Sequence, residues 1–347
     1  MASVNVLSSS HKFKGQGVER AFYNHLKLLN ILDFEIFVNR LRLTTDIVHV
    51  HTPDPQFFFK LLSSKKKALL VVSAHIVPAS LVGSLKGTSL WLPIFSRYLR
   101  RFYNTCDVVL AVSDQVKDEL LEFGVKEEKL KVFRNFVIRK EFEAFPSLEE
   151  RTALRQRWNI PLNAFVVVGA GQVQPRKGVK DFIKVAEILG KDFCFVWAGG
   201  MPFKAFTAGY EEMKKLMESA PKNVKFLGTL DKDEMKNVYA MADAFFLPSH
   251  QETFGLVIPE AAGSGLPIVL RDLEVYVPIF GGRYLKGNSV EEFAEILEKL
   301  KEDSKFWEEW SRKARELFEE YTEDRAAVRL KNIYAEAYRK KFGRDLI

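Results

Sequence analysis

The feature that most constrains this 347-residue chain is a repeated alternation of short apolar segments with amphipathic ones. This pattern is typical of parallel α/β folds, because consecutive parallel strands are joined by a helical crossover. Helices are expected at 18–30 and 114–123, and nearly throughout the chain after about residue 290. Strands are expected at 3–8, 34–38, 46–51, 68–75, 107–113, 129–135, 164–171, 192–200, 223–228, 243–249 and 266–270.

The length of the chain predicts two domains, since a single hydrophobic core rarely grows beyond about 250–300 residues. We expect one Rossmann-like domain at 1–140, a charged linker at 141–162 and a second Rossmann-like domain at 163–320. A C-terminal helix at 321–347 is expected to pack back on the first domain. Ligands of such sheets bind at the carboxyl ends of the strands, so we expect the chemistry in a cleft between the domains.

The charge is unevenly distributed, with 14 Lys/Arg against 5 Asp/Glu in residues 1–101 and 38 against 40 in the remainder. The basic first third predicts an anionic partner, and the absence of nucleic-acid-binding motifs favours a membrane surface. Only two cysteines occur, Cys106 and Cys194, which excludes a disulfide framework and indicates a reducing compartment. With no signal peptide and no spanning segment recognised, we expect a cytoplasmic protein that is peripheral on the inner face of the cell membrane.

The stretch 252–260, "ETFGLVIPE", follows one strand candidate and precedes another. We expect a helix that Glu252 precedes and Glu260 closes, so that about 12 Å of helical rise separates two carboxylates. Between them, the backbone N–H groups of Phe254, Gly255 and Leu256 would bind an anion. Carboxylates for hydroxyls beside amides for phosphate indicate a nucleotide-sugar site. The alternative is a capped helix with two solvated acids.

Two glycine-containing turns follow strand candidates. In "GAGQVQPRKGVKDFI" (169–183), Arg176 and Lys177 are placed to neutralise a diphosphate. A dinucleotide fingerprint would need a third glycine, and Gln174 stands there instead. In "KFKGQGVERAF" (12–22), Gly15 and Gly17 would allow a ligand close to the backbone. The alternative for 169–183 is that Arg176 and Lys177 are a solvated pair. The alternative for 12–22 is an ordinary glycine turn.

Three histidines, His49, His51 and His75, lie at or near strand ends. They lack accompanying cysteines or paired acids, so we expect no metal site, although a zinc site stays an alternative. The sequence "DKD" at 231–233 resembles a metal-binding Asp-x-Asp, but its position at the start of a helix favours an N-cap.

The segment 91–103, "WLPIFSRYLRRFY", combines aromatic and basic side chains at helical spacing. A helix of this kind can lie at a bilayer surface, and the alternative is a core-packed helix with an exposed basic face. The residues expected on the membrane or acceptor side are Trp91, Phe95, Arg97, Arg100 and Arg101.

Together these motifs resemble the family 4 retaining glycosyltransferases of GT-B fold over nearly the whole chain. The details are most similar to bacterial enzymes that add a second hexose to glucosyl-diacylglycerol. The stretches that carry this similarity are "GVERAFYNH", "DIVHVHT", "RKG" followed by "DFI", "FFLPSHQETFGLVIPEA" and "VLRDLEVY…YLKGNSVEEF".

The resemblance implies transfer of a hexose from UDP-glucose or UDP-galactose to a membrane glycolipid, without a metal or other cofactor. It implies that domain 1–140 binds the acceptor and domain 163–320 binds the donor. The implied catalytic residues are Glu252, His75 and Lys177. The implied donor-binding residues are Gly17, Arg176, Lys177, Thr253, Phe254, Gly255, Leu256 and Glu260.

Two positions depart from the family pattern. Gln172 stands where many members have an arginine, so Arg176 is expected to replace that cation. Ser73-Ala74-His75 stands where the lipid enzymes often have His-Ala-His, which leaves the acceptor open. A transferase acting on a soluble polysaccharide, protein or small molecule, a nucleotide-sugar epimerase and a binding protein without catalysis are therefore alternatives.

Overall fold

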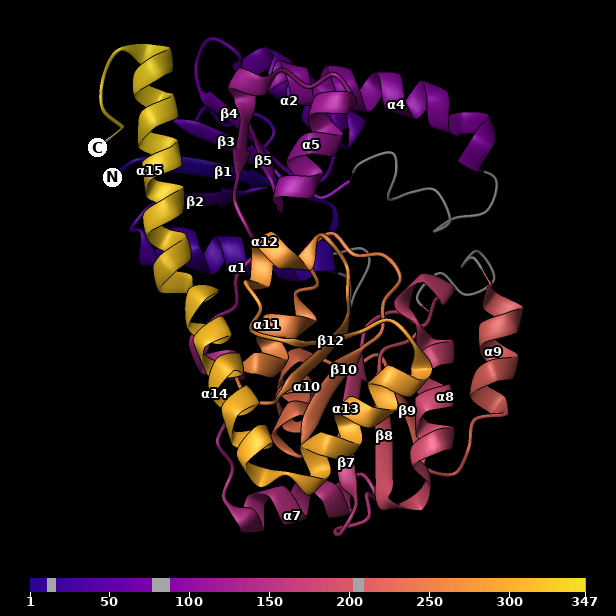
Figure 1. Ribbon diagram of the computed structural model, residues 1–347. Helices are drawn as coiled ribbons and strands as arrows, with labels where there is room; N and C mark the ends of the chain where they lie inside the picture. Colours follow the sequence, from indigo (N-terminus) through magenta and orange to yellow (C-terminus); the bar gives the residue numbers. More distant parts are fainter. Residues whose placement is uncertain (11–16, 77–87, 202–208, 347) are drawn as a thin grey trace. The chain divides into compact units, whose positions relative to one another are not determined.

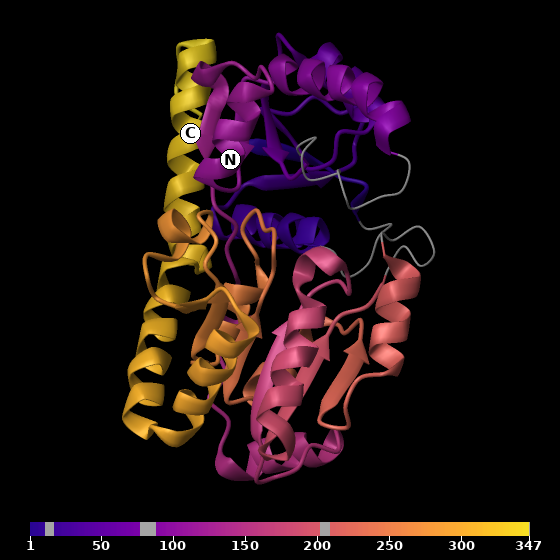
Figure 2. The same cartoon turned by 45° about the vertical axis from the view of Figure 1, so that its right-hand side comes forward.

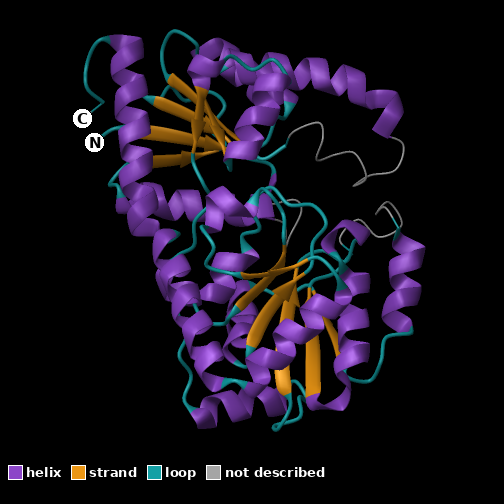
Figure 3. Cartoon of the chain, viewed as in Figure 1, coloured by secondary structure: helices purple, strands orange, loops and turns teal. Residues whose placement is uncertain are grey.

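The computed structural model describes residues 1–10, 17–76, 88–201 and 209–346. Unit 1 comprises Met1–Phe136 and Glu323–Ile347, and unit 2 comprises Val137–Thr322. Each unit contains its own parallel sheet with helices beside it, so each is described by itself (Figure 1, Figure 3).

Unit 1 contains a six-stranded sheet with the order β2-β1-β3-β4-β5-β6. All of its pairings are parallel, which requires a crossover between consecutive strands. Strands β3, β4 and β5 are buried along their whole length, as expected of a sheet covered on both faces. The strands are β1 (Ser3–Leu7), β2 (Glu35–Val38), β3 (Ile47–Val50), β4 (Leu69–Ala74), β5 (Val108–Ala111) and β6 (Leu130–Val132).

The C-terminal helix α15 (Glu323–Phe342) belongs to unit 1, although it follows unit 2 in the sequence. It packs against α1 and β4, and it runs beside the unit 1 sheet in both views (Figure 1, Figure 2). The other helices of unit 1 are α1 (Gly17–Ile31), α2 (Pro55–Ser64), α4 (Thr88–Thr105), α5 (Asp114–Glu122) and the 3₁₀ turn η2 (Glu127–Lys129).

Unit 2 contains a second parallel sheet with the order β12-β11-β10-β7-β8-β9. Counted within the unit, this is the doubly wound order of dinucleotide-binding folds, in which the winding direction reverses between the first and fourth strands. The strands are β7 (Phe165–Ala170), β8 (Phe193–Ala198), β9 (Val224–Gly228), β10 (Ala244–Leu247), β11 (Ile268–Arg271) and β12 (Leu285–Gly287).

The helices of unit 2 alternate with these strands and end in two longer helices, α13 and α14. Helix α13 packs on α8, and α14 packs on α11 and α13. The helices are α6 (Arg139–Phe142), α7 (Leu148–Arg157), η3 (Pro175–Lys177), α8 (Val179–Leu189), η4 (Gly190–Asp192), α9 (Tyr210–Glu218), α10 (Lys232–Ala240), α11 (Val257–Ala262), α12 (Tyr276–Phe280), α13 (Val290–Glu302) and α14 (Ser304–Glu320).

All eleven predicted strands are present, and the α/β class is confirmed. The strand β12 was missed, because Lys286, Gly287 and Asn288 follow Leu285 and leave no apolar run. The predicted helices at 18–30 and 114–123 correspond to α1 and α5, and the helical C-terminal region is also present.

The expected linker at 141–162 differs from the structure, which places this range inside unit 2. Helix α7 carries two arginines, Arg151 and Arg155, that pair with Asp243 of the same unit. Arg155 is only 7% exposed, and it donates to the carbonyl oxygens of Met241, Leu162 and Ala164 and pairs with Asp243. The charge of this segment therefore anchors α7 to the unit, and composition alone does not distinguish that role from a linker.

Among the described residues, no helix is both long enough and apolar enough to cross a bilayer.

Candidate active site

The predicted donor-binding residues of unit 2 lie at the switch point of its sheet. Strands β7 and β10 are neighbours, with Ala244 opposite Val167 and Phe245 opposite Val168. The chain turns to opposite sides after these two strands, and in doubly wound sheets ligands bind at the carboxyl ends of such strands. The loop after β7 contains Arg176 and Lys177, and the loop after β10 contains Glu252.

The two loops are in direct contact. Gly178 has φ +71°, and a Cβ atom there would lie 2.1 Å from the carbonyl oxygen of Pro248. Only glycine allows this approach, because an L side chain would be strained and would also collide with backbone. The backbone N–H of His250 donates to the carbonyl oxygen of Arg176 at 2.8 Å. The loops therefore hold Lys177 close to Glu252.

Lys177 and Glu252 form a buried ion pair between Nζ and Oε1, with side chains 11% and 6% exposed. The hydroxyl of Ser249 also donates to Glu252 Oε1, at 3.3 Å. Burial lowers the pKa of Lys177, and the carboxylate of Glu252 opposes this shift. A buried cation and anion of this kind stabilise each other, and loss of either partner leaves an uncompensated charge. Sequence analysis named both residues, but it did not predict their ion pair.

Arg176 lies beside the pair and donates from Nε to Gln174 Oε1 at 2.9 Å. Its expected substitution for the cation missing at Gln172 stays a prediction. A second arginine, Arg271 at the end of β11, pairs with Asp181 and donates to the carbonyl oxygen of Pro248 at 3.2 Å. Arg271 thus ties β11 and α8 to the loop after β10, a role that no sequence signal indicated.

The expected helix between Glu252 and Glu260 is wrong in its bounds. Helix α11 begins only at Val257 and ends at Ala262, so Glu252 precedes it within an irregular segment and Glu260 lies inside it. Gly255 has φ +76°, a left-handed conformation that a helix cannot continue through. The estimate of about 12 Å of helical rise therefore does not apply.

The segment between Glu252 and Glu260 offers free backbone N–H groups, while one of its side chains packs into the hydrophobic core. The backbone N–H groups of Phe254, Gly255 and Leu256 donate to no other described residue, as expected of groups placed before a helix. The ring of Phe254 is buried and packs edge-to-face on Tyr321, so its side chain serves the core. Thr253 is half-buried in the same segment.

Glu260 is 1% exposed, and its Oε2 accepts a hydrogen bond from the hydroxyl of Tyr239 at 3.3 Å. A carboxylate on the buried side of a helix is retained only where polar partners satisfy it. The expected contact with a donor ribose stays a prediction.

Sequence analysis missed Tyr276 in α12, although the stretch "VLRDLEVY" includes it. Its ring is fully buried, and its hydroxyl has no hydrogen-bond partner among the described residues. Burial and then the charge of Glu252 raise its pKa well above the usual range, so the hydroxyl stays protonated near that carboxylate. Buried hydroxyls are normally paired, so an unpaired one next to a candidate site indicates a donor left for a ligand.

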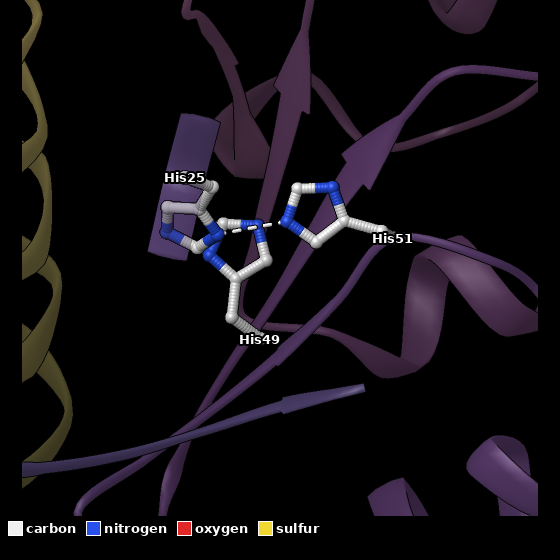
Figure 4. Close-up of side chains that lie close together, drawn as sticks. All are labelled: His25, His49 and His51. Atoms are coloured by element: carbon white, nitrogen blue, oxygen red, sulfur yellow. Dashed lines mark hydrogen bonds between the residues drawn. The ribbon is translucent and has the colours of Figure 1, made fainter. Parts of the chain in front are cut away.

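In unit 1, histidines gather where β3 and β4 end. His49 lies in β3, His51 and His75 follow β3 and β4, and His25 reaches them from α1 (Figure 4). The rings of His49 and His51 are stacked with centroids 4.9 Å apart, which confirms that they share a face. The cluster is completed by His25 of α1 and Tyr334 of α15. The sequence analysis predicted neither residue, because only the tertiary structure brings α1 and α15 to this edge of the sheet.

The histidine cluster is joined by hydrogen bonds rather than arranged around a shared centre. His25 Nδ1 and His51 Nε2 are 2.8 Å apart, a hydrogen-bond distance. Two ligands of one tetrahedral Zn²⁺ would lie about 3.3 Å apart at ordinary bond lengths. His25, His49 and His51 nevertheless each place a nitrogen within 4.8 Å of the others, so zinc stays an alternative that needs a direct test. The Asp-x-Asp-like stretch 231–233 is not a candidate metal site of the same kind. Asp231 caps α10 by accepting from the N–H of Glu234, which confirms the expected N-cap.

Burial keeps the histidine cluster uncharged. Desolvation lowers the pKa of His25 to about 3 and that of His75 to about 4, and it lowers those of His49 and His51 well below 6.5. Neighbouring imidazoles depress the pKa values of His25, His49 and His51 further, because a second positive charge would be repelled.

The aromatic stripe predicted on the membrane side packs inward instead, as far as it is described. Phe102 is fully buried, Tyr98 donates to the carbonyl oxygen of Pro53 at 2.8 Å, and both rings contact Phe58 of α2. Phe95 is half-buried beside Tyr98. The physical reason is that α4 needs an apolar face to pack on α2.

The basic residues Arg97, Arg100 and Arg101 of α4 are exposed, as expected. The side chain of Trp91 lies outside the described residues, as does Gly15. Gly17 is the first residue of α1.

Known proteins resemble both units. Residues 10–140 match the family described as Glycosyltransferase Family 4, and residues 150–317 match Glycosyl transferases group 1. An alpha-galactosylglucosyldiacylglycerol synthase of Streptococcus pneumoniae is 36% identical over 97% of this chain and 89% of its own length. The chain belongs to the glycosyltransferases.

Two further proteins extend this comparison. A processive diacylglycerol alpha-glucosyltransferase of Acholeplasma laidlawii is 28% identical to this glycosyltransferase, over 83% of this chain and 84% of the relative. The crystal structure of Anabaena Alr3699/HepE in complex with UDP-glucose is 17% identical and superposes with a TM-score of 0.76, over 97% of this chain and all of that one. The predicted GT-B fold is thereby confirmed.

The neutral histidine cluster predicts that this glycosyltransferase loses stability in mild acid. An unfolded histidine binds a proton near pH 6.5, whereas folded His25 does so only near pH 3. Between these values the unfolded chain holds more protons, so stability is full above pH 6.5 and falls as the pH decreases. Each buried histidine contributes up to about 2 kcal/mol of this loss between pH 7 and pH 5.

Denaturant unfolding of the wild type and His25→Gln at pH 7 and pH 5 measures this loss. The variant should lose less stability on acidification than the wild type does. An equal loss in His25→Gln and the wild type would contradict the explanation.

The unpaired hydroxyl of Tyr276 predicts a variant that is stable but weak in ligand binding. Tyr276→Phe removes a buried group without a described partner, so its melting temperature should stay unchanged or rise. The KM for the nucleotide-sugar donor should rise several-fold, and Tyr284→Phe serves as the control on the same side of the unit. A fall of several degrees in melting temperature would show that the Tyr276 hydroxyl is paired within the protein.

Proposed function

We propose that this glycosyltransferase moves a hexose from UDP-glucose or UDP-galactose to glucosyl-diacylglycerol, with retention of configuration at the anomeric carbon. The observation that carries the proposal is the buried pair of Lys177 and Glu252 at the switch point of unit 2. The lipid acceptor is supported by the relative that is 36% identical and named as an alpha-galactosylglucosyldiacylglycerol synthase.

The donor's diphosphate needs positive charge that is fixed before the reaction begins. Lys177 offers an ammonium group held by two loops, and Arg176 lies next to it in the chain. Preorganised groups of this kind stabilise developing charge without reorganisation, which makes them effective in catalysis. The free amides before α11 add further donors for a phosphate or a sugar hydroxyl.

Glu252 and Glu260 supply acceptors for hydroxyl groups of the donor. In this proposal Glu252 binds hydroxyls of the transferred sugar, and its pairing with Lys177 keeps it oriented. Glu260 binds the ribose, with Tyr239 holding its second oxygen. On the family resemblance, we also assign His75 of unit 1 to the transferred sugar and the backbone at Gly17 to the diphosphate.

The chemistry follows from charge stabilisation. The bond between the anomeric carbon and the phosphate oxygen breaks, and Lys177 and Arg176 stabilise the negative charge on the departing diphosphate. The acceptor hydroxyl attacks from the same face, and its proton passes to a phosphate oxygen of the leaving group. No covalent intermediate with the protein is needed, and the protein's cations do the work that a metal ion does in other phosphate sites. We therefore propose that transfer is metal-independent.

The exposed sides of α2 and α4 support binding to an anionic membrane. Phe59 of α2 is 69% exposed, Leu62 is 44% exposed and Ile94 of α4 is 74% exposed. The two helices are in contact (Figure 1). Exposed cations follow α2 directly, at Lys65 and Lys66, and lie within α4 at Arg97 and Arg101. We call this the apolar–basic face, made of Phe59, Leu62, Lys65, Lys66, Ile94, Arg97 and Arg101. Apolar side chains insert among lipid tails while each cation near anionic headgroups contributes about 1 kcal/mol.

Product analysis tests the function directly. Purified protein is incubated with labelled UDP-glucose or UDP-galactose and vesicles that contain glucosyl-diacylglycerol. Formation of a diglycosyl lipid with the new linkage in the α configuration is expected, also in the presence of EDTA. Transfer to soluble sugars but not to the vesicles would establish the soluble-acceptor alternative.

Substitution of Lys177 predicts a loss of turnover. Lys177→Ala should lower kcat about 10²–10³-fold, because removal of one preorganised donor to a developing charge has effects of this size. Lys180→Ala is the matched control, since Lys180 is an exposed lysine in the next helix and should retain full activity. Near-normal turnover in folded Lys177→Ala would contradict the assignment.

Substitution of the apolar–basic face predicts a loss of membrane binding. Phe59→Ser combined with Ile94→Ser should lower partitioning onto phosphatidylglycerol vesicles at least about tenfold, because each inserted apolar side chain contributes roughly 1–3 kcal/mol. Vesicle flotation measures this. Val277→Ser, at an exposed aliphatic residue of unit 2, is the control and should float with the vesicles as the wild type does. Unchanged flotation of the double variant would remove this face from the proposal.

A further inference from the structure

The side chains of the histidine cluster are joined by hydrogen bonds into one unbranched chain. It begins at Ser73 in β4 and ends at His75 in the loop after β4. Ser73 Oγ lies 2.8 Å from His49 Nε2, and His49 Nδ1 lies 2.6 Å from the hydroxyl of Tyr334. That hydroxyl lies 3.1 Å from His25 Nε2. His25 Nδ1 then lies 2.8 Å from His51 Nε2 (Figure 4). His51 Nδ1 finally lies 3.1 Å from His75 Nε2.

The two contacts of the Tyr334 hydroxyl have different lengths, and the difference assigns its proton. Bonds donated by O–H groups are typically 2.5–3.0 Å long, whereas bonds donated by N–H groups are typically 2.7–3.2 Å long. The 2.6 Å contact to His49 fits an O–H donor, and the 3.1 Å contact to His25 fits an N–H donor. Tyr334 therefore donates to His49 Nδ1 and accepts from His25 Nε2.

This one assignment determines the position of every other proton in the chain. A neutral imidazole has one N–H and one lone pair, so each ring that donates through Nε2 must accept at Nδ1. His25 accepts from His51, and His51 accepts from His75. On the other side, His49 donates from Nε2 to Ser73 Oγ. The premise of neutral rings is supported by the lowered pKa values of all four histidines.

We propose that Tyr334 of the C-terminal helix fixes the tautomer of His75, so that His75 keeps its proton on Nε2 and presents Nδ1 as an acceptor. Nδ1 of His75 makes no hydrogen bond to another described residue. The inference rests on the proposed function in one respect, namely that His75 contacts the transferred sugar. The unprotonated Nδ1 then accepts a hydrogen bond from a sugar hydroxyl, and Tyr334 is a positioning residue that acts on His75 through the rings of His25 and His51.

The chain also gives a role to the departure at Ser73. Its hydroxyl ends the hydrogen-bonded series by accepting from His49. A hydroxyl is suited to this end, because it accepts and donates at once and does not impose a direction.

Nitrogen NMR of protein labelled with ¹⁵N-histidine tests the proposal without any substrate. Long-range proton–nitrogen correlations at pH 7.5 distinguish protonated from unprotonated ring nitrogens. We expect His25, His49, His51 and His75 all to carry the proton on Nε2, with spectra unchanged by EDTA. A proton on Nδ1 of His75, or a spectrum that changes when EDTA removes a metal, would overturn the proposal.

Two variants interrupt the chain at different points. Tyr334→Phe removes the central hydroxyl, so the tautomers of both His49 and His75 should become mixed. The amide of His25→Gln can donate to Tyr334 from the position of Nε2, but it has no acceptor atom at the position of Nδ1. His75 should therefore become mixed while His49 stays protonated on Nε2. Identical behaviour of His49 and His75 in His25→Gln would contradict a linear chain, even if Tyr334→Phe fails to fold.

The matched control is Tyr338→Phe, one helical turn further along α15. Tyr338 is also buried, but its hydroxyl accepts from Arg344 at 3.2 Å and not from the histidines. In Tyr334→Phe the value of kcat/KM for the nucleotide sugar should fall about fivefold, the size expected for one hydrogen bond. In Tyr338→Phe both tautomers and kcat/KM should match the wild type, and an equal loss in both variants would show a merely structural effect.

The two proposals fail separately. Ordered tautomers in a protein that uses no nucleotide sugar would refute the proposed function and support the histidine chain. Efficient transfer by a protein whose His75 carries its proton on Nδ1 would do the reverse.

Discussion

The parallel pairing of β7 with β10 is the constraint on which the candidate site of unit 2 depends. These strands are 73 or more residues apart in sequence, yet their carboxyl ends lie side by side. The loops that follow must then share one edge of the sheet, and Gly178 lets them approach to backbone contact. The buried ion pair of Lys177 and Glu252 is the chemical result, because neither charge would be tolerated there without the other.

In unit 1, too, neighbouring parallel strands bring polar side chains together at one edge of the sheet, but these side chains are neutral. Neighbouring strands β3 and β4 place His49, His51 and His75 at one edge, and helices α1 and α15 add His25 and Tyr334. Here the groups are kept neutral by desolvation and joined by hydrogen bonds. Unit 2 thus holds a buried pair of opposite charges, and unit 1 holds a buried cluster of neutral rings. In both units the partners fix the orientation of the polar side chains.

Helix α4 has one side that packs against α2 and an opposite side that is exposed. The aromatic residues of α4 bury themselves against Phe58, which gives the helix its place in the fold. The opposite side is left with Ile94 and the arginines, and Phe59 and Leu62 of α2 add apolar surface beside it. Aromatic residues at helical spacing thus indicate a buried side as readily as a membrane-facing one, because both need the same period.

The sequence by itself determined the α/β class and the eleven predicted strands, and it drew attention to Arg176, Lys177, Glu252 and Glu260, because apolar periodicity and short loop motifs are local properties. It did not determine the bounds of α11, where a left-handed Gly255 delays the helix, nor the place of α7, whose charges are paired with Asp243. Only the tertiary structure showed that Lys177 meets Glu252, that Tyr276 is buried without a described partner and that Tyr334 meets two histidines. These contacts join residues far apart in the chain, and local sequence patterns carry no information about such distances.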